Sequence, residues 1–356
     1  MSVLHVVLPN DIDDPATPSG GNSYDRRVLR GLAGSGWSVR EHPVPGAWPR
    51  PDATERAGLD RVLAGVPDGA VVLVDGLVAS AVPEVLVPQA ERLRLVVLVH
   101  MPLGDESADQ RAAEGTALAA ATAVVTTSEW TRRRLRDLYA LPADRLHVAL
   151  PGVEPAPVAA GSAAGSELLC VAAVTPHKGH DVLAAALATL TELTWDCVCV
   201  GALTRDPGFV AGLRRQMSGD GIADRVRLAG PRTGDALDAA YARADLLVLP
   251  SHGETYGMVV TEALARGIPV LATSAQGLPE ALGRAPDGSL PGLLVPPGDP
   301  PALAGALRRW LGDGDLRRRL RRSARDRRTT LTGWEKTVKR VADVLDRAPS
   351  VSGRST

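Results

Sequence analysis

The chain has 356 residues, about twice the length of a typical domain, so we expect two domains. Apolar residues make up 45% of it, charged residues make up 23%, and the formal net charge at pH 7 is −1. This balance excludes nucleic acid or any other polyanion as an obligate partner on charge grounds. Cys170, Cys197 and Cys199 lie in apolar runs without CxxC spacing, so we expect reduced, buried thiols, no metal-ligand set and a cytoplasmic location.

The first ten residues, MSVLHVVLPN, are mainly apolar and lack the basic region that opens a secretion signal. The apolar stretch is also too short to cross a membrane. We therefore expect it to form the first strand, and we find no transmembrane pattern further along the chain.

Short apolar runs alternate with longer amphipathic stretches through most of the sequence. The runs are residues 4–9, 70–75, 93–100, 123–128 and 146–150, and then 167–174, 196–202, 225–230, 244–250 and 268–273. This alternation predicts α/β domains with doubly wound parallel sheets. Residues 151–166 are rich in Pro, Gly, Ala and Ser, a composition typical of a linker. We therefore predict two Rossmann-like domains, residues 1–155 and 166–330, that face each other across a cleft.

An arginine-rich run follows at residues 317–328, with eight arginines in twelve positions. A solvated helix face is one interpretation. The other is a peripheral contact with anionic lipid, since each basic residue near such a surface adds about 1 kcal/mol. Residues 331–348 then have the pattern of a last amphipathic helix, followed by a tail to residue 356.

The stretch SHGETYGMVVTEALARGIPV, residues 251–270, carries two glutamates, Glu254 and Glu262. On one helix they would lie about 12 Å apart along the axis, too far for the carboxylate pair of a glycosidase. A loop that holds Glu254, followed by a helix from near Gly257 with Gly267 as its C-cap, fits the pattern better. The amides of residues 255–258 would then lie at a helix N-terminus and favour phosphate. The two glutamates would flank that phosphate, each accepting hydrogen bonds from one sugar of a nucleotide sugar.

A diphosphate also requires a cation, and Lys178 is a candidate. Lysine occurs only at positions 178, 336 and 339, and Lys178 lies with Gly179 between a predicted strand and helix. A point charge on a long stem suits a phosphate oxygen. The alternative is an ordinary surface lysine.

These segments resemble a known family. GETYGMVVTEALARGIPV is similar to the E-x7-E segment of the retaining glycosyltransferases of family 4, which have the GT-B fold. The resemblance covers most of the chain and includes, in order, PSGGNSYDRRVLRGLAGSGWSV, VLVHMP, VALPGVEP, RADLLVLPS, QGLPEAL and GLLVPPGDPPALAGAL.

The resemblance implies that the helix in the C-terminal segment, residues 331–356, crosses back and packs on the first domain. It also implies roles for individual residues. Glu262 would hold the ribose, Glu254 the donor sugar, and Lys178 the leaving diphosphate, while His100 would reach the donor sugar or the attacking hydroxyl from across the cleft. The implied donor-binding residues are Gly20, Gly21, Lys178, Gly201, Arg205, Gly230, Arg232, Glu254, Thr255, Tyr256, Gly257, Met258 and Glu262. On the acceptor side are Asp11, Asp13 and His100, with Asp11–Asp13 alternatively capping the first helix. His100, Lys178 and Glu254 would be catalytic, and His100 is alternatively a polar cap of the sheet.

The expected reaction is transfer of a hexosyl group from a UDP- or GDP-linked sugar to a hydroxyl, with same-face attack and retention. The expected partners are thus a small-molecule donor and acceptor, with no metal and no cofactor. Ala173 stands where the family usually has an arginine, which removes a bidentate phosphate partner. Arg205 is a candidate substitute. The alternatives are a catalytically weak or inactive nucleotide-sugar-binding partner of another transferase, and a GT-B-fold epimerase.

Overall fold

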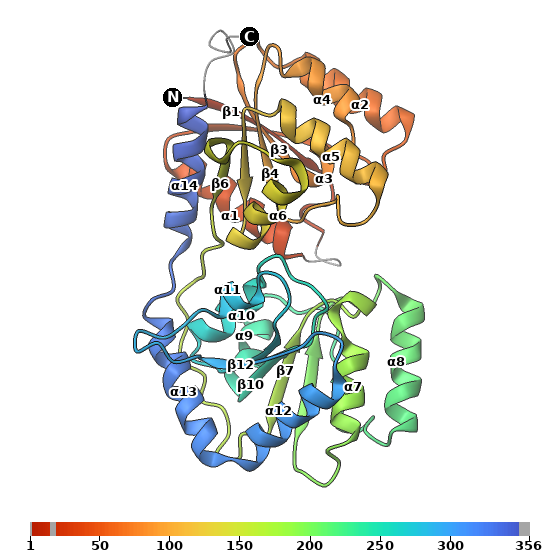
Figure 1. The fold of residues 1–356 in the computed structure, drawn as a ribbon, viewed down its shortest axis with the longest axis vertical. Coiled ribbons are helices and arrows are strands. Elements are labelled where there is room, and N and C mark those ends of the chain that lie inside the picture. The colour runs from red at the N-terminus through yellow and green to blue at the C-terminus, as the bar shows by residue number, and fades with distance from the viewer. Residues whose placement is uncertain (1, 15–18, 349–356) are drawn as a thin grey trace. The chain divides into compact units, whose positions relative to one another are not determined.

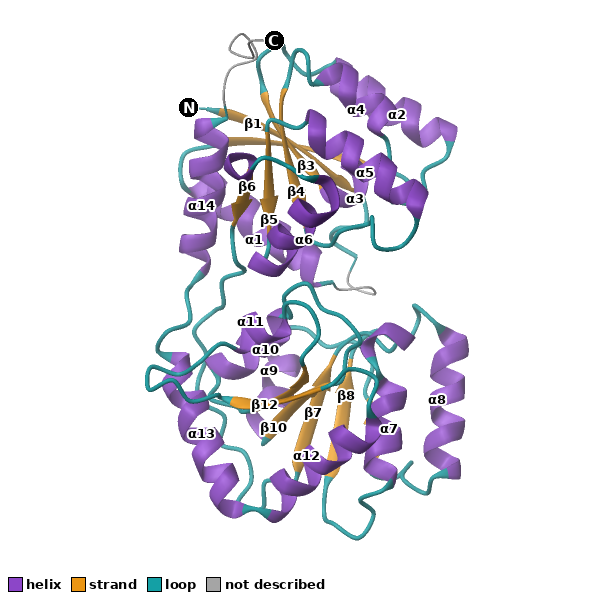
Figure 2. Cartoon of the chain, in the orientation of Figure 1, coloured by secondary structure: helices purple, strands orange, loops and turns teal. Residues whose placement is uncertain are grey.

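The computed structural model describes residues 2–14 and 19–348. Among these residues the chain divides into two compact units (Figure 1). The first unit contains residues 2–14, 20–152 and 334–348, and the second contains residues 153–333. Each has a six-stranded, all-parallel sheet with helices on both faces (Figure 2), which confirms the predicted α/β class.

The sheet of the first unit has the strand order β2-β1-β3-β4-β5-β6. Its strands are β1 (Val3–Pro9), β2 (Ser38–Val44), β3 (Val71–Asp75), β4 (Arg94–Val99), β5 (Ala123–Thr126) and β6 (Leu146–Val148). Its helices are α1 (Gly20–Gly34), α2 (Ala53–Ala64), α3 (Gly76–Ala79), α4 (Pro83–Gln89), α5 (Ala108–Ala120), α6 (Glu129–Tyr139) and α14 (Trp334–Arg347), with a 3-10 turn η1 (Ala143–Arg145).

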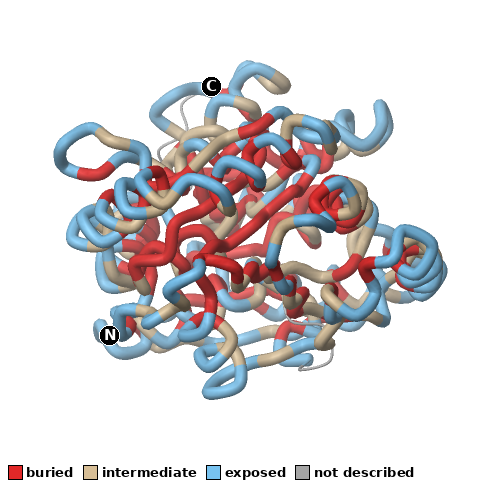
Figure 3. The backbone as a smooth tube through the Cα atoms, turned by 90° about the horizontal axis from the view of Figure 1, so that it is seen from below, coloured by how far each residue is buried: buried red, intermediate tan, exposed pale blue. Residues whose placement is uncertain are grey.

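The central strands of this sheet are apolar on both faces because helices cover both. One core packs β1, β3, β4 and β5 against α2, α3, α4 and α5. The alternate side chains of β1, such as Val6 and Leu8, lie with Val28 and Leu29 of α1. All five residues of β3 and all but the first of β4 are accordingly buried. Figure 3 colours the backbone by burial. The strands thus form continuous apolar runs, as expected of a buried parallel sheet.

Helix α14, the last of the described chain, packs on α1 within the first unit. Its buried residues, Thr337, Val338, Val341, Val344 and Leu345, recur at the spacing of one helix face. The two helices approach closely at Gly31, where an added Cβ would lie 2.3 Å from a methyl carbon of Val338. The last described helix thus packs in the same unit as the first described strand.

The sheet of the second unit has the order β12-β11-β10-β7-β8-β9. Its strands are β7 (Glu167–Val171), β8 (Asp196–Val200), β9 (Val226–Leu228), β10 (Leu246–Leu249), β11 (Val270–Thr273) and β12 (Gly292–Val295). Its helices are α7 (His180–Ala188), α8 (Pro207–Gly219), α9 (Gly234–Arg243), α10 (Met258–Ala265), α11 (Leu278–Leu282), α12 (Pro300–Gly312) and α13 (Gly314–Arg328), with a 3-10 turn η2 (Pro176–Lys178). One core joins the sheet to α7, α8, α12 and α13, and the other joins it to α9, α10 and α11.

Residues 151–166, expected to be a linker, are not a free connection. The amide of Ala159 donates to the carbonyl of Arg266, and Ser162 donates from its amide and its hydroxyl to the buried carboxylate of Asp245. Arg321 pairs with the same carboxylate. From Val153 onward the segment is therefore part of the second unit, because its polar backbone groups are satisfied there.

Much of the arginine-rich run turns inward rather than toward solvent. Arg317 and Arg328 donate to backbone carbonyls of the second unit, and Arg321 pairs with Asp245. Arg319 and Arg322 are exposed. In the described ranges, no helix is both long enough and apolar enough to cross a membrane. The lipid contact through residues 317–328 stays a prediction.

Candidate functional site

The strand order of the second unit places two loops side by side. Chain order runs outward from the centre of the sheet in both directions, through β8 and β9 on one side of β7 and through β11 and β12 on the other side of β10. The two loops start side by side at the carboxyl ends of β7 and β10, and the chain then continues to opposite faces of the sheet. This divergence leaves a crevice between the loops, where ligands bind in such sheets. Lys178 lies in the loop after β7, and Glu254 lies in the loop after β10.

Lys178 and Glu254 form an ion pair at this point. The Nζ of Lys178 lies 2.7 Å from the Oε1 of Glu254, which also accepts a hydrogen bond from the Ser251 hydroxyl at 2.9 Å. The backbone of Ser251 is held in turn by the hydroxyl of Thr273, 2.7 Å from its carbonyl. The two charged side chains are 27% and 17% exposed, so the pair is partly buried but not closed off from solvent.

The glycine after Lys178 permits the close approach of the two loops. Gly179 has a left-handed backbone (φ 68°), and an added Cβ would lie 2.2 Å from the carbonyl oxygen of Pro250. Any other side chain here would push the lysine loop away from the end of β10. The amide of His252 also donates to the carbonyl of His177, which joins the two loops directly.

The N-terminus of α10 faces the site without a side-chain cap. Gly257 is the N-cap, with φ 93°, and has no side chain that could accept from the first-turn amides. The backbone before it is fixed, because the amide of Gly277 donates to the carbonyl of Glu254 and a Cβ on Gly277 would lie 2.1 Å from the carbonyl oxygen of Thr255. The N-terminus of such a helix binds an anion through its unpaired N–H groups and the positive end of the helix dipole.

Glu262 lies one turn into α10 and is oriented by a buried phenol. The hydroxyl of Tyr241 donates to its Oε2 at 2.8 Å. Burial and the charge of Glu262 raise the pKa of Tyr241 well above its usual value, so this phenol stays a donor. Helix α10 ends at Ala265 with Arg266 as its C-cap, one residue before the glycine expected there. Gly267 follows with φ 67° and donates to the carbonyl of Leu264.

The remaining predicted donor residues are more scattered. Gly201 lies against the end of β7, where an added Cβ would be 1.9 Å from the carbonyl oxygen of Ala172, and its amide donates to Gly230. Arg205 is exposed in the loop after β8. Arg232 lines a groove of about 510 Å³ along the sheet face beside α9, which extends to the starts of β7 and β8 at Glu167 and Asp196.

The first unit has a second charged cluster at its own strand ends. His100 follows β4, Asp75 ends β3, and Asp25 lies on α1. The Nε2 of His100 is 2.8 Å from Asp25 and 3.9 Å from Asp75. The ring of Tyr24 meets the imidazole edge to face, with centroids 5.3 Å apart. Two buried carboxylates thus hold His100 at the end of its strand.

These carboxylates set the charge of the histidine. Burial opposes ionisation of His100, but the attraction and hydrogen bond of Asp25, with a smaller effect of Asp75, outweigh it and raise the pKa to about 9. Burial, together with the charge of Asp25, raises the pKa of Asp75 to about 7. Near neutral pH the imidazole is therefore a cation and a hydrogen-bond donor, not a general base.

Other predicted residues of the first unit lie around this cluster or beside α1. Gly21, in the first turn of α1, lies over the imidazole, and an added Cβ would be 3.4 Å from its Cδ2. Gly20 begins the same helix. Asp13 binds the guanidinium of Arg26 on the side of α1 rather than capping that helix, and the carbonyl of Asp11 accepts from Asp14 in a turn.

Sequence reasoning missed three residues of these sites: Asp25, Asp75 and Tyr241. Asp75 had a local signal, since it is the acidic residue that ends the apolar run at 70–75. Asp25 and Tyr241 lie within helices, and only the packing of those helices on the sheets brings them to His100 and Glu262. The expectation of no metal-ligand set stays a prediction, although ligand groups do meet. The fold brings together ligand groups in two places, Cys170 with His180 and Cys199, and Asp25 with Asp75 and His100.

The second unit is similar to a known protein family. Residues 164–327, nearly all of the second unit, match the family model described as Glycosyl transferases group 1. The D-inositol 3-phosphate glycosyltransferase of Jonesia denitrificans is 32% identical over 63% of this chain and 57% of its own length. That of Salinispora tropica is 32% identical over 74% of this chain and 59% of its own length. The chain thus spans less than two thirds of the length of these relatives.

The fold itself is that of the GT-B glycosyltransferases. The structure of Anabaena HepE in complex with UDP-glucose superposes with a TM-score of 0.78, covering 97% of this chain and 100% of that one at 17% identity. The two Rossmann-like units are the two halves of this fold.

Proposed function

We propose that the protein is a retaining hexosyltransferase that uses a UDP- or GDP-linked sugar and transfers the sugar to a hydroxyl group. The observation that carries the proposal is the Lys178–Glu254 pair, at the crevice where the strand order reverses and beside the uncapped N-terminus of α10. The match of the second unit to group 1 glycosyltransferases and the GT-B fold support it.

In this proposal the donor lies along the carboxyl edge of the second sheet. The diphosphate takes the α10 amides and the ammonium of Lys178, which neutralises the charge that develops as the glycosidic bond breaks. Glu262, already oriented by Tyr241, accepts hydrogen bonds from the ribose, and Glu254 accepts from the sugar. Because Lys178 and Glu254 are paired, each charge is positioned before the donor arrives, and little reorganisation is needed on binding.

The chemistry proposed is attack on the face that the leaving group vacates. The acceptor hydroxyl loses its proton to the departing phosphate, and the sugar is transferred with retention and without a metal or cofactor. His100 contributes from the first unit as a cation that donates a hydrogen bond to a substrate oxygen, and the residues near it form the acceptor side. The relatives named for D-inositol 3-phosphate make that compound the first acceptor to test.

The proposal predicts that Lys178→Ala and Glu262→Ala each weaken donor binding. We expect UDP or GDP, and one of the hexose conjugates of that nucleotide, to raise the melting temperature of the unaltered protein. The protein should also release nucleoside diphosphate slowly from that conjugate. Each variant should lose at least tenfold in affinity, because about 1.5–3 kcal/mol is typical for a hydrogen bond to a charged group. Thermal shift and nucleotide release measure both effects.

Lys339→Ala is the matched control, since Lys339 lies on α14 and pairs with Asp343 there. It should behave as the unaltered protein. If the unaltered chain binds a nucleotide sugar but releases no nucleoside diphosphate from it, the inactive-partner alternative is favoured and Ala173 becomes the suspect. Failure of every nucleotide to bind would contradict the donor site, and an inverted anomer in the product would contradict the mechanism.

A further inference from the structure

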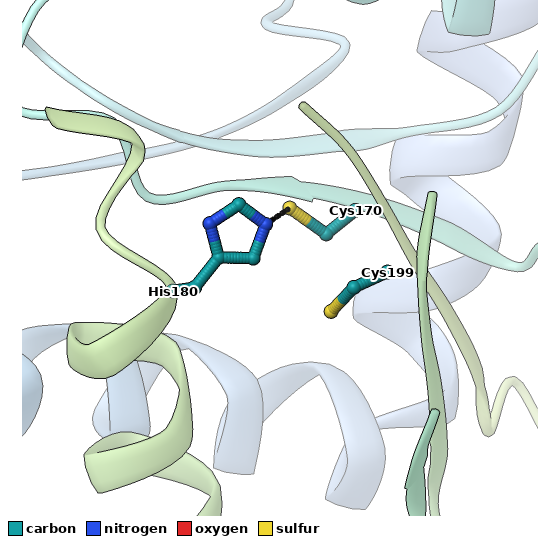
Figure 4. A group of neighbouring side chains, drawn as sticks. All are labelled: Cys170, His180 and Cys199. Carbon is teal, nitrogen blue, oxygen red and sulfur yellow. Dashed lines mark hydrogen bonds between the residues drawn. The ribbon is translucent and has the colours of Figure 1, made fainter. Parts of the chain in front are cut away.

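A compact group of three metal-ligating side chains lies inside the second unit (Figure 4). Cys170 of β7 and Cys199 of β8 are paired in register across the sheet, and His180 is the first residue of α7. One ligand atom of each lies within 4.8 Å of the others. In Figure 4 the imidazole points toward the two thiols from the start of its helix.

The group lies in the dry core rather than in the crevice. Cys170, Cys199 and His180 are at most 2% exposed, and their neighbours in this core are mainly apolar. The Nε2 of His180 is 3.7 Å from the Sγ of Cys170, a weak contact. Its Nδ1 is buried and has no hydrogen-bond partner among the described residues. An ion held by Nε2 would leave this Nδ1 as it is, so the observation that points to a ligand is the convergence of Nε2 and the two sulfur atoms on one point.

An ordinary core histidine explains the group poorly. Such a residue typically gives its ring nitrogens strong oxygen or nitrogen partners, whereas the contact of this Nε2 is a weak one to the sulfur of Cys170. The donor set is instead that of a thiophilic metal ion, because thiolate and imidazole ligands select Zn²⁺ and similar soft cations.

We propose that Cys170, Cys199 and His180 bind a divalent, thiophilic cation of the Zn²⁺ class. Two thiolates balance the charge of the ion, so the site is neutral in the apolar core. Binding displaces one proton from each thiol, the neutral imidazole gives a lone pair, and two protons leave to solvent. The three side chains supply three of the four ligands of a tetrahedral Zn²⁺, and a water molecule that enters with the ion supplies the fourth. Since the group is fully covered, the ion enters as β7, β8 and α7 pack.

The site is independent of the proposed transfer reaction, although it lies next to it in the chain. His180 is two residues after Lys178, so a bound ion would anchor the start of α7 and the turn that carries the lysine. The site is therefore structural, and its detection does not depend on any activity.

The test is the metal content and cobalt spectrum of the full-length protein. We expect one zinc per chain by elemental analysis after expression, or after refolding with Zn²⁺ under a phosphine reductant. Refolding with Co²⁺ should give a thiolate-to-cobalt charge-transfer band. Cys170→Ala, Cys199→Ala and His180→Ala should each lower bound metal at least tenfold.

Cys197→Ala is the matched control. Cys197 is equally buried on the same face of β8 but lies outside the three-residue group. This variant should keep its metal. The proposal is overturned if neither expression nor refolding yields bound metal, or if Cys197→Ala loses as much metal as the other three variants. If a variant does not fold, the cobalt spectrum of the unaltered chain tests the site instead. Absence of the thiolate-to-cobalt band from that spectrum is sufficient to reject the proposal.

Discussion

His100 shows how single residues of this protein acquire their charge from the fold. Alone at the end of a strand it would be mostly neutral at pH 7, but Asp25 and Asp75 hold its pKa at about 9. A histidine with a raised pKa stabilises the folded state fully below its unfolded value of 6.5, and this contribution is lost as the pH rises through 9. The pKa of Asp75 is raised to about 7, so its ionisation as the pH rises also lowers the stability of the folded state.

We therefore predict that the free energy of unfolding falls by up to about 3 kcal/mol between pH 6.5 and pH 9. Denaturant unfolding across this range measures it. Asp25→Asn removes the main charge that holds the proton, so its profile should be flatter and the imidazole should titrate lower by NMR. A variant profile parallel to that of the unaltered protein would show that Asp25 does not set the charge of His100.

At the scale of elements, the approach of α1 and α14 depends on one glycine. A Cβ at Gly31 would lie 2.3 Å from the Cγ2 and 3.2 Å from the Cβ of Val338, so rotating the valine cannot remove the clash. We predict that Gly31→Ala lowers the free energy of unfolding by about 1–3 kcal/mol, the usual cost of overpacking. Chemical denaturation of the purified variant measures this change.

Gly34→Ala, in the same helix, is the control for helix propensity. An added Cβ there meets nothing within 4 Å, so this change should be neutral or stabilising by up to about 1 kcal/mol. Equal effects of the two substitutions would contradict the close packing of α1 on α14.

The strands that sequence patterns failed to predict are both at sheet edges. β2 (Ser38–Val44) and β12 (Gly292–Val295) each pair with only one neighbour in their sheets. Edge strands are covered less completely, so they tolerate residues such as Arg40 and Glu41, which are exposed in β2. β2 therefore lacks the continuous apolar run that identified the central strands. β12 has such a run, but it is only four residues long, Gly-Leu-Leu-Val, and follows Pro291 directly.

At the scale of the whole molecule, the last helix belongs to the first unit. Ending the chain at Gly333 removes α14 and uncovers the face on which Val338, Val341 and Leu345 lie. Burial of each such side chain is worth about 1.5–3 kcal/mol, so the loss approaches the total stability of a domain. We predict that the first unit unfolds while the second, which has its own two cores, retains a cooperative transition.

Calorimetry of the truncated chain measures this prediction. The transition of the first unit should disappear or move down by more than 10 °C, roughly the shift that several kcal/mol produce in a domain of this size. An unchanged melting profile would contradict the role of α14, and loss of both transitions would show that the second unit does not fold without the first.

The sequence by itself determined the class of this protein. The central strands, two parallel sheets, the turn at Lys178 and the helix after Gly257 follow from hydrophobic periodicity and glycine positions, which act over a few residues. The two glutamates of residues 254–262 also indicated a donor site, because their spacing is local.

Only the tertiary structure decided which distant groups meet. The pairing of Lys178 with Glu254, of Tyr241 with Glu262, and of His100 with Asp25 joins residues from separate elements. Cys170, Cys199 and His180 come together for the same reason, since β7 and β8 are neighbours and α7 begins above them. Strand order and helix packing set these contacts, and neither leaves a short-range pattern in the chain.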